Sequence, residues 1–180
     1  SEHVNGFELA DLVTENAVAA NLVKNSDNLW SVYLTPQGVG TVTVTIQPSS
    51  VFDSAGNPNP SAAKLIRYYD NINPATTLIS ETPNFTNTTP ITVKALFSKD
   101  VYGFEQSDLL ITNATLVKFQ KNSDREWLFD IAPISIGTVT VDIPAEVVQD
   151  ISGNGNHAAV RMTRFFDNQK PSVIFSSNIP

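Results

Sequence analysis

Side chains with oxygen donors recur in short loops along this sequence and could bind a hard metal cation. The pattern Asp-x-x-Gly-Asn-x-Asn begins at Asp53 and again at Asp150. Calcium takes about six to eight oxygen ligands from carboxylates, amides and carbonyls. The residues considered as ligands are Asp70, Asn71, Asp100, Glu105, Asp150, Asn154, Asp167 and Asn168. This chemistry predicts a structural calcium ion (Ca2+) at an interdomain junction, held by Asp70, Asn71 and loop acids such as Asp100 or Glu105. The ion would rigidify the joint by neutralising clustered acids.

The Asp-x-x-Gly-Asn pattern has a second interpretation, which is a tight turn. The aspartate would cap backbone amides, and Gly or Asn would take a positive φ angle. For Asp53 and Asp150 the turn is the favoured interpretation. For the Asp-Asn pairs that begin at Asp70 and Asp167, calcium binding and a plain linker both stay open.

Catalytic chemistry is not indicated. The sequence has no cysteine, which excludes disulfides, thiol catalysis and cysteine-based zinc sites. It shows no Ser-His pairing with an orienting acid and no Gly-rich phosphate loop. The two histidines, His3 and His157, do not recur with the acidic pattern. A site that recurs along the chain suits a structural ion better than an active centre, so we expect no enzyme.

The charge of the chain limits its partners. The formal net charge is -7, with 18 acidic and 11 basic residues. Binding to phosphate backbones needs clustered Lys and Arg, so nucleic acid is not expected as a partner. The same acidity opposes docking on an anionic membrane surface. No apolar run approaches the roughly 20 residues of a membrane helix, so no membrane insertion is expected.

An internal repeat organises the whole chain. A shift of 97 residues, from Val4 to Val101, aligns the sequence with itself without gaps. Residues 4–8, 24–27 and 40–44 fall on 101–105, 121–124 and 137–141. A match of this length does not arise by chance, so the chain contains a tandem duplication.

The positions at which the two copies of the repeat start and stop determine the expected domains. The first copy, residues 1–70, has no counterpart of residues 75–97 and is incomplete at its start. Residues 71–74 form a linker, and residues 75–167 form a complete second copy. Residues 168–180 are a further linker and the first strand of a following repeat, because 172–180 match 75–83.

Alternation with a period of two predicts half-buried strands. In the complete copy seven strands are expected, at about residues 75–82, 90–98, 108–112, 115–120, 126–132, 138–144 and 159–167. The breaks between them are rich in Gly, Asn, Asp and Pro. Seven short strands in under 100 residues indicate an immunoglobulin-like sandwich. The fold class is therefore all-β, with tandem seven-stranded immunoglobulin-like β-sandwiches, the first copy lacking its opening strands.

Strand order sorts the loops between the two ends of the sandwich. The loops after the second, fourth and sixth strands, 99–107, 121–125 and 149–158, share the end at which the linker enters. They carry most of the acidic side chains, whereas the loops at the opposite end are nearly uncharged. Trp30 and Trp127 lie in register with core positions, which favours burial over a sugar-stacking role.

Three motifs resemble those of bacterial immunoglobulin-like repeats. They are Gly-Phe-Glu-x-x-Asp-Leu, Gly-Thr-Val-Thr-Val and Asp-x-x-Gly-Asn-x-Asn, each present in both copies in exact or near-exact form. The resemblance implies an extracellular, cell-surface protein built as a stalk, adhesin or fibre. Its partners would be neighbouring repeats, in the same chain or in adjacent subunits. The linker Asp70-Asn71-x-x-Pro74 is similar to calcium-binding linkers in cadherin-like and bacterial immunoglobulin-like arrays.

Two further functional readings stay open. The chain could be a carbohydrate- or ligand-binding module of a secreted multidomain protein, or an ancillary domain beside a secreted enzyme. The shifted phase also raises head-to-tail polymerisation, in which the tail at 172–180 completes the first copy of another subunit by strand addition. A window from a longer array is the favoured explanation of the phase, because the tail replaces only one of the missing strands.

Overall fold

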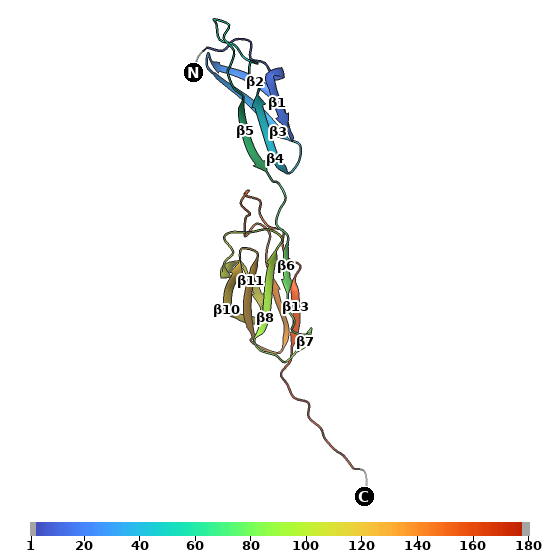
Figure 1. Cartoon of the computed structure of the whole chain (residues 1–180). Coiled ribbons are helices and arrows are strands. Elements are labelled where there is room, and N and C mark those ends of the chain that lie inside the picture. The colour runs from blue at the N-terminus through green and yellow to red at the C-terminus, as the bar shows by residue number, and fades with distance from the viewer. Residues whose placement is uncertain (1–2, 178–180) are drawn as a thin grey trace. The chain divides into compact units, whose positions relative to one another are not determined.

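The computed structural model describes residues 3–177 and shows two compact units. The division falls between Ile72 and Asn73, and each unit has its own pattern of strand pairing. Apart from two short 3-10 turns, the regular structure of the described residues is entirely β (Figure 1). The all-β class and the tandem immunoglobulin-like arrangement are thereby confirmed.

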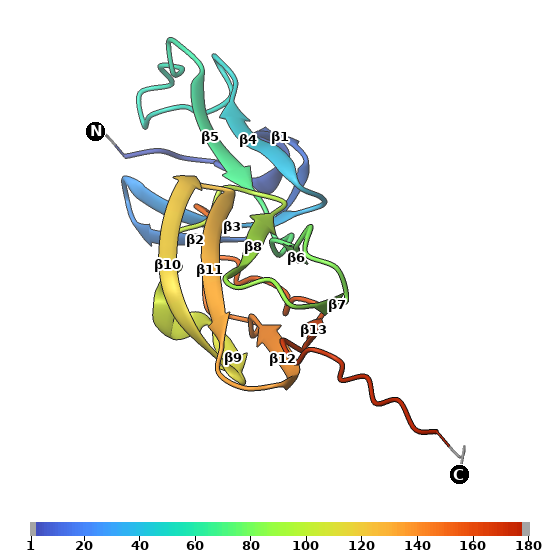
Figure 2. The same cartoon turned by 90° about the horizontal axis from the view of Figure 1, so that it is seen from below.

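The second unit, from Asn73 onward, contains eight strands and one 3-10 turn. They are β6 (Thr76–Ile79), β7 (Phe85–Thr86), β8 (Ile91–Phe97), η2 (Gln106–Asp108), β9 (Leu110–Thr112), β10 (Ala114–Ser123), β11 (Glu126–Pro133), β12 (Gly137–Asp142) and β13 (Met162–Phe166). One sheet has the order β10-β11-β8-β6 and the other β7-β13-β12-β9. Figure 2 shows β10, β11 and β8 running side by side in the first of these sheets.

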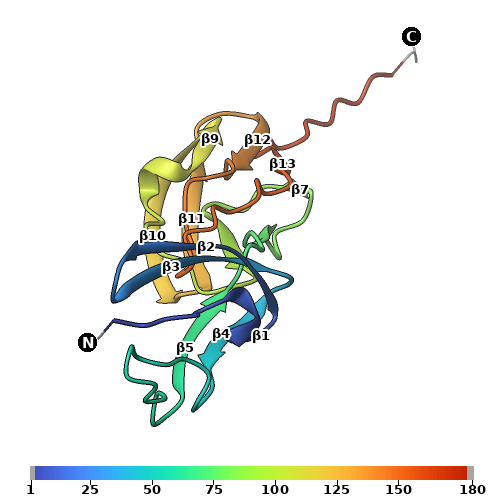
Figure 3. The same cartoon turned by 90° about the horizontal axis from the view of Figure 1, so that it is seen from above.

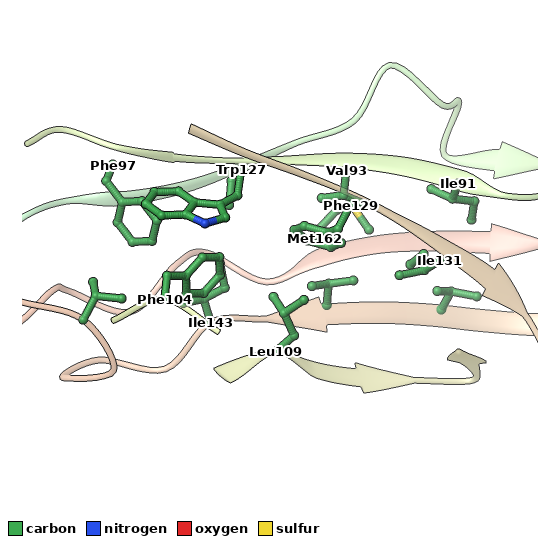
Figure 4. Packing of buried hydrophobic residues seen from close by; sticks show 14 of the residues in the cluster. Ile91, Val93, Phe97, Phe104, Leu109, Trp127, Phe129, Ile131, Ile143 and Met162 are labelled. Atoms are coloured by element: carbon green, nitrogen blue, oxygen red, sulfur yellow. The ribbon is translucent and has the colours of Figure 1, made fainter. Parts of the chain in front are cut away.

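Alternating burial places the core between the two sheets. In β8 the side chains of Ile91, Val93, Ala95 and Phe97 are buried, and those between them are not. Trp127, Phe129 and Ile131 do the same in β11. Figure 4 shows Phe97, Trp127 and Phe129 in one cluster with Phe104, Leu109 and Met162. Removing this apolar surface from water is the main driving force for the fold.

The chain changes sheets between β9 and β10, at a single asparagine. Asn113 adopts a φ of 56°, a left-handed conformation that Asn tolerates better than most residues. Its side chain binds the loop after β11, because Nδ2 donates to the Ser135 carbonyl at 2.9 Å and Oδ1 accepts from the Ser135 hydroxyl at 2.8 Å. The corner is therefore fixed by one side chain. Asn16 repeats the conformation in the first unit, with a φ of 54°.

Strand β7 was not expected from the sequence. It has two residues, Phe85 and Thr86, and pairs in parallel with Phe165 and Phe166 of β13. The other pairings are antiparallel. Because β7 is too short to show alternation, only the tertiary pairing identifies it as a strand.

The first unit contains the counterparts of the later strands only. They are η1 (Leu9–Asp11), β1 (Leu12–Glu15), β2 (Ala17–Ser26), β3 (Leu29–Pro36), β4 (Gly40–Ile46) and β5 (Ala63–Tyr69). One sheet has the order β1-β4-β5, and β2 pairs with β3 (Figure 3). Within residues 3–72 no strand corresponds to β6, β7 or β8, as the phase of the repeat predicts.

This difference leaves one edge of the first unit uncovered. In the second unit β11 pairs with β10 on one side and β8 on the other. Its counterpart β3 pairs, among the described strands, with β2 alone. Core positions are correspondingly more exposed, so that Leu65 is 44% exposed where its counterpart Met162 is 6% exposed. The first unit is therefore a sandwich that is open on one side.

Candidate functional site

The acidic pattern at Asp150 forms a turn that is closed by its own aspartate. Asp150 Oδ1 accepts hydrogen bonds from the backbone N–H of Ser152 and of Asn154, both at 2.9 Å. Gly153 between them has a φ of +85°, which a side chain would strain. The turn interpretation of the pattern is therefore correct at this position.

A lysine from a distant loop completes the surroundings of Asp150. Lys99 Nζ lies 3.0 Å from Asp150 Oδ2, and the aspartate side chain is only 3% exposed. Burial by itself would raise the pKa of this carboxyl group. The hydrogen bonds from Asn154, Lys99 and Ser152 outweigh that effect and lower the pKa to about 2.

The lowered pKa predicts acid sensitivity of the second unit. A carboxyl group whose pKa falls from 3.8 to about 2 on folding stabilises the protein fully above pH 4. That contribution, about 2 kcal/mol at most, is lost as the pH falls through 2. We expect Asp150→Asn to flatten the decline of the urea unfolding free energy between pH 4 and 2. A decline as steep as that of the wild type would contradict the assignment.

Asn156, which ends the same pattern, is buried and fully hydrogen-bonded. Its Oδ1 accepts from the backbone N–H of Val147 at 3.0 Å and of Val148 at 3.1 Å. Its Nδ2 donates to the Pro144 and His157 carbonyls, each at 2.9 Å, and to the Thr76 hydroxyl at 3.1 Å. The amide thus ties β6 to the loop between β12 and β13.

The first unit repeats this turn in a more open setting. Asp53 Oδ1 accepts from the N–H groups of Ala55 and Asn57, each at 2.8 Å. The hydrogen bond from the Asn57 side chain to Asp53 Oδ2 is the main cause that lowers the pKa of Asp53. Asn59 donates to the Gln47 carbonyl at 2.8 Å, as Asn156 does to Pro144. The turn is therefore a local structure that does not need the rest of the sandwich.

Two other residues considered as calcium ligands have partners within the protein. Asp100 Oδ1 accepts from Arg125 Nε at 2.6 Å. Glu105 precedes η2, and its backbone N–H donates to Asp108 Oδ2 at 2.8 Å. The sequence spacing Glu-x-x-Asp resembles a capping box and could have identified this helical turn.

The linker residues have a different environment. Asp70 Oδ1 accepts from the Ile72 N–H at 2.9 Å, and Asp167 Oδ1 accepts from the Gln169 N–H at 2.8 Å. Asn71 and Asn168 are exposed. Among residues 3–177, no three Asp, Glu or His side chains gather into a group that could hold a metal ion.

The two tryptophans have the same register and different environments. Trp127 is 2% exposed and makes edge-to-face contacts with Phe97 at 5.4 Å and Phe104 at 5.3 Å between ring centroids. Its core role, predicted from the sequence, is confirmed. Trp30 is half-buried and contacts Phe7 at 5.5 Å. No counterpart of Phe97 covers its other side, because β8 has no equivalent in residues 3–72.

An apolar groove opens at Trp30 in the first unit. It has a volume of about 300 Å³ and is lined mainly by Phe7, Leu12, Leu22, Trp30, Val44 and Leu65. The indole Nε1 of Trp30 is buried and has no hydrogen-bond partner among the described residues. An unpaired buried donor is costly, so Trp30 carries a polar group that the described structure leaves unsatisfied.

Together, the sandwich topology, the repeated acidic turn and the tandem order define a pair of immunoglobulin-like domains. The chain belongs to the bacterial Ig-like domain family, whose model matches residues 1–68 and 70–165. No curated protein sequence matches it. No helix within residues 3–177 is long and apolar enough to cross a membrane.

One solved structure that aligns with the chain is that of InvD from Yersinia pseudotuberculosis. The alignment covers 91% of this chain and 49% of the InvD chain, with 11% identity and a TM-score of 0.36. The chain therefore spans about half the length of the structure that it matches.

Proposed function

We propose that the chain is a structural, non-enzymatic segment of the stalk of a bacterial surface protein or adhesin, exposed outside the cell. The observation that carries the proposal is the repetition of one sandwich design at a fixed spacing of 97 residues, from Val4 to Val101. Its buried residues form a core and its acidic loops close on themselves through turns. Such a module supplies length and resistance to proteolysis rather than chemistry.

The entry to the second unit supports a stiff joint. Asn73 Nδ2 donates to the Gly155 carbonyl at 2.6 Å, and the His157 N–H donates to the Pro74 carbonyl at 2.8 Å. Pro74 is fully buried. The residues that enter the unit are thus bound to its acidic loop, which shortens the freely moving part of the linker.

Small-angle X-ray scattering on chains lengthened by one and two copies of residues 74–170 tests the stalk. A stiff array adds a constant increment to the maximal dimension for each copy. A flexible one grows roughly as the square root of the number of copies. A maximal dimension that grows only as the square root of the number of copies would contradict the spacer function.

Calcium at the linker stays a proposal for the Asp-Asn pairs at Asp70 and Asp167. Among the other acids, Asp100 pairs with Arg125 and Asp150 pairs with Lys99. We expect titration calorimetry to show calcium binding that Asp70→Asn weakens and Asp150→Asn leaves unchanged. The absence of heat in the wild type, after treatment with EDTA, would exclude structural calcium.

A second candidate function is ligand binding at the end of the second unit that carries few charges. Phe85 is 80% exposed and its ring lies 5.8 Å from that of Phe165. Both line a shallow hollow with Asn87, Asp167 and Gln169. An exposed aromatic pair beside polar side chains is the arrangement that sugar rings stack on. Binding on a glycan array that Phe85→Ala removes would favour this alternative.

A further inference from the structure

We propose that Asn87 in the second unit is a site of N-linked glycosylation, and that Phe85 is the platform on which the first sugar packs. The inference adds a covalent modification to the stalk function and does not depend on it. N-linked sugars are attached at the pattern Asn-x-Thr or Asn-x-Ser, where x is not Pro. The pattern occurs at Asn84, Asn87 and Asn113. The structure distinguishes these three positions.

Asn113 is unsuited to modification, because its side-chain amide is part of the fold. Its Nδ2 donates to the Ser135 carbonyl at 2.9 Å, and its Oδ1 accepts from the Ser135 hydroxyl at 2.8 Å. The residue is half-buried and has a φ of 56°. A sugar on Nδ2 would lie between the β9–β10 corner and the loop that this corner binds. We therefore expect Asn113 to stay unmodified while the unit is folded.

The pattern at Asn84 is held in a strand. Its second and third residues, Phe85 and Thr86, form β7, and the Asn84 carbonyl accepts from the Phe165 N–H at 2.7 Å. Thr86 is half-buried, and its hydroxyl accepts a hydrogen bond from the Thr88 N–H at 2.9 Å. An enzyme that recognises Asn-x-Thr must reach the hydroxyl as well as the amide. We therefore expect Asn84 to be a poor acceptor.

The pattern at Asn87 begins where β7 ends. Asn87, Thr88 and Thr89 are all exposed and belong to no strand. Both the asparagine and the threonine that the pattern requires are thus open to an approaching enzyme. The strand before them fixes the direction in which the loop leaves the sheet, because β7 pairs with β13. Asn87 is therefore the acceptor that the folded unit offers.

Phe85 lies two residues before Asn87 and is placed to receive the attached sugar. Side chains two residues apart on an extended chain point to the same side of it. Phe85 and Asn87 accordingly line one hollow together with Phe165, and its volume is about 480 Å³. The Phe85 ring is 80% exposed and lies 5.8 Å from the Phe165 ring. A sugar ring carries C–H groups on its faces, so packing it on Phe85 removes apolar surface of both from water.

Attachment of the sugar is a group transfer without oxidation or reduction. The Asn87 amide nitrogen attacks the anomeric carbon of a sugar that is activated as a diphosphate ester, linked to a nucleoside or to a lipid. A C–N bond forms, and the bond from that carbon to the diphosphate oxygen breaks. The diphosphate leaves with the electron pair, and the amide loses one proton to a base of the transferase. Donor and transferase are separate from this chain.

Incubation of the full chain with a soluble Asn-x-Thr glycosyltransferase and its nucleoside-diphosphate hexose tests the acceptor. Mass spectrometry of peptides should place one hexose on Asn87 of the folded chain and none on Asn113. A free peptide of residues 110–118 should accept the hexose, because there the Asn113 amide is released. Thr89→Ala should abolish the modification of Asn87. An unmodified Asn87, or modification of Asn113 at the same rate, would overturn the proposal.

The chain lengthened by one copy of residues 74–170 extends this test to an array. Both copies of Asn87 should carry a hexose, because the acceptor loop and β7 lie within the repeated segment. Modification of the last copy alone would show that a following repeat covers the loop, and would overturn the site as a property of the array.

Urea unfolding of the modified and unmodified chains tests the platform. We expect the hexose to raise the unfolding midpoint of the second unit in the wild type and to leave it unchanged in Phe85→Ala. The variant keeps the acceptor pattern, and Phe85 is exposed, so both chains fold and carry the sugar. Equal shifts in the two chains would overturn the role of Phe85.

The same variants separate this proposal from the other functions. Binding of free glycans depends on Phe85 and not on Thr89, so Thr89→Ala abolishes attachment and leaves binding on a glycan array unchanged. The scattering series uses unmodified chains, so the stalk proposal stands or fails independently of the modification.

Discussion

Trp127→Ala is expected to destabilise the second unit by about 3–5 kcal/mol, the range for removing a large aromatic side chain from a packed core. Trp127 is 2% exposed and touches two other rings, and its strand β11 pairs with β10 on one side and β8 on the other. The cavity left behind cannot collapse without moving β8 and β11. Hydrogen exchange, measured peptide by peptide, reports the loss of stability in each unit separately.

Trp30→Ala provides the comparison within the same molecule. Trp30 occupies the same position in the repeat, yet it borders an open groove and touches one ring, that of Phe7. Water already reaches this region, so less apolar surface is re-exposed and no sealed cavity forms. We expect a cost well below that of Trp127→Ala. Equal costs would show that the first unit is closed in solution.

Asn156→Ala has the second largest expected effect, about 3–4 kcal/mol on the second unit. The substitution removes five hydrogen bonds, to two N–H groups, two carbonyls and the Thr76 hydroxyl. The bonds of the Val148 N–H and the Thr76 hydroxyl are buried, and the other three are partly buried. Each unsatisfied buried group costs about 1–3 kcal/mol, less where water can enter the space of the side chain. Urea unfolding measures the change in free energy.

Asn59→Ala is the control for this prediction. Asn59 makes equivalent bonds to Ser50, Val51 and Gln47, but it lies nearer the surface, where water can replace them. Its loss should cost about 1 kcal/mol, the net value of an ordinary hydrogen bond. If Asn59→Ala were as costly as Asn156→Ala, burial would not be the cause of the difference.

The sequence predicted the strands because their signal is local. Period-two alternation in residues 91–97 and 126–132 marks the inward side chains directly, and those side chains are the buried ones. The turn at Asp150 is local too, since its hydrogen bonds span two and four residues. The repeat alone predicted that the first unit would contain no counterparts of β6, β7 and β8.

Contacts between distant parts of the chain could not be predicted in this way. The ion pair of Lys99 with Asp150 joins loops about 50 residues apart, and nothing near either residue indicates the other. The parallel pairing of β7 with β13 leaves no alternation to detect. The acidic residues were considered together as calcium ligands because the loops share one end of the sandwich. The structure shows that sharing an end does not bring Asp100, Glu105 and Asp150 into one group.

The short parallel pair of β7 with β13 bears on how the second unit responds to pulling force. The N–H groups of Phe165 and Asp167 donate to the Asn84 and Thr86 carbonyls, at 2.7 and 2.9 Å. Tension applied through the two ends of the unit loads these bonds in shear, so they must fail together instead of one at a time.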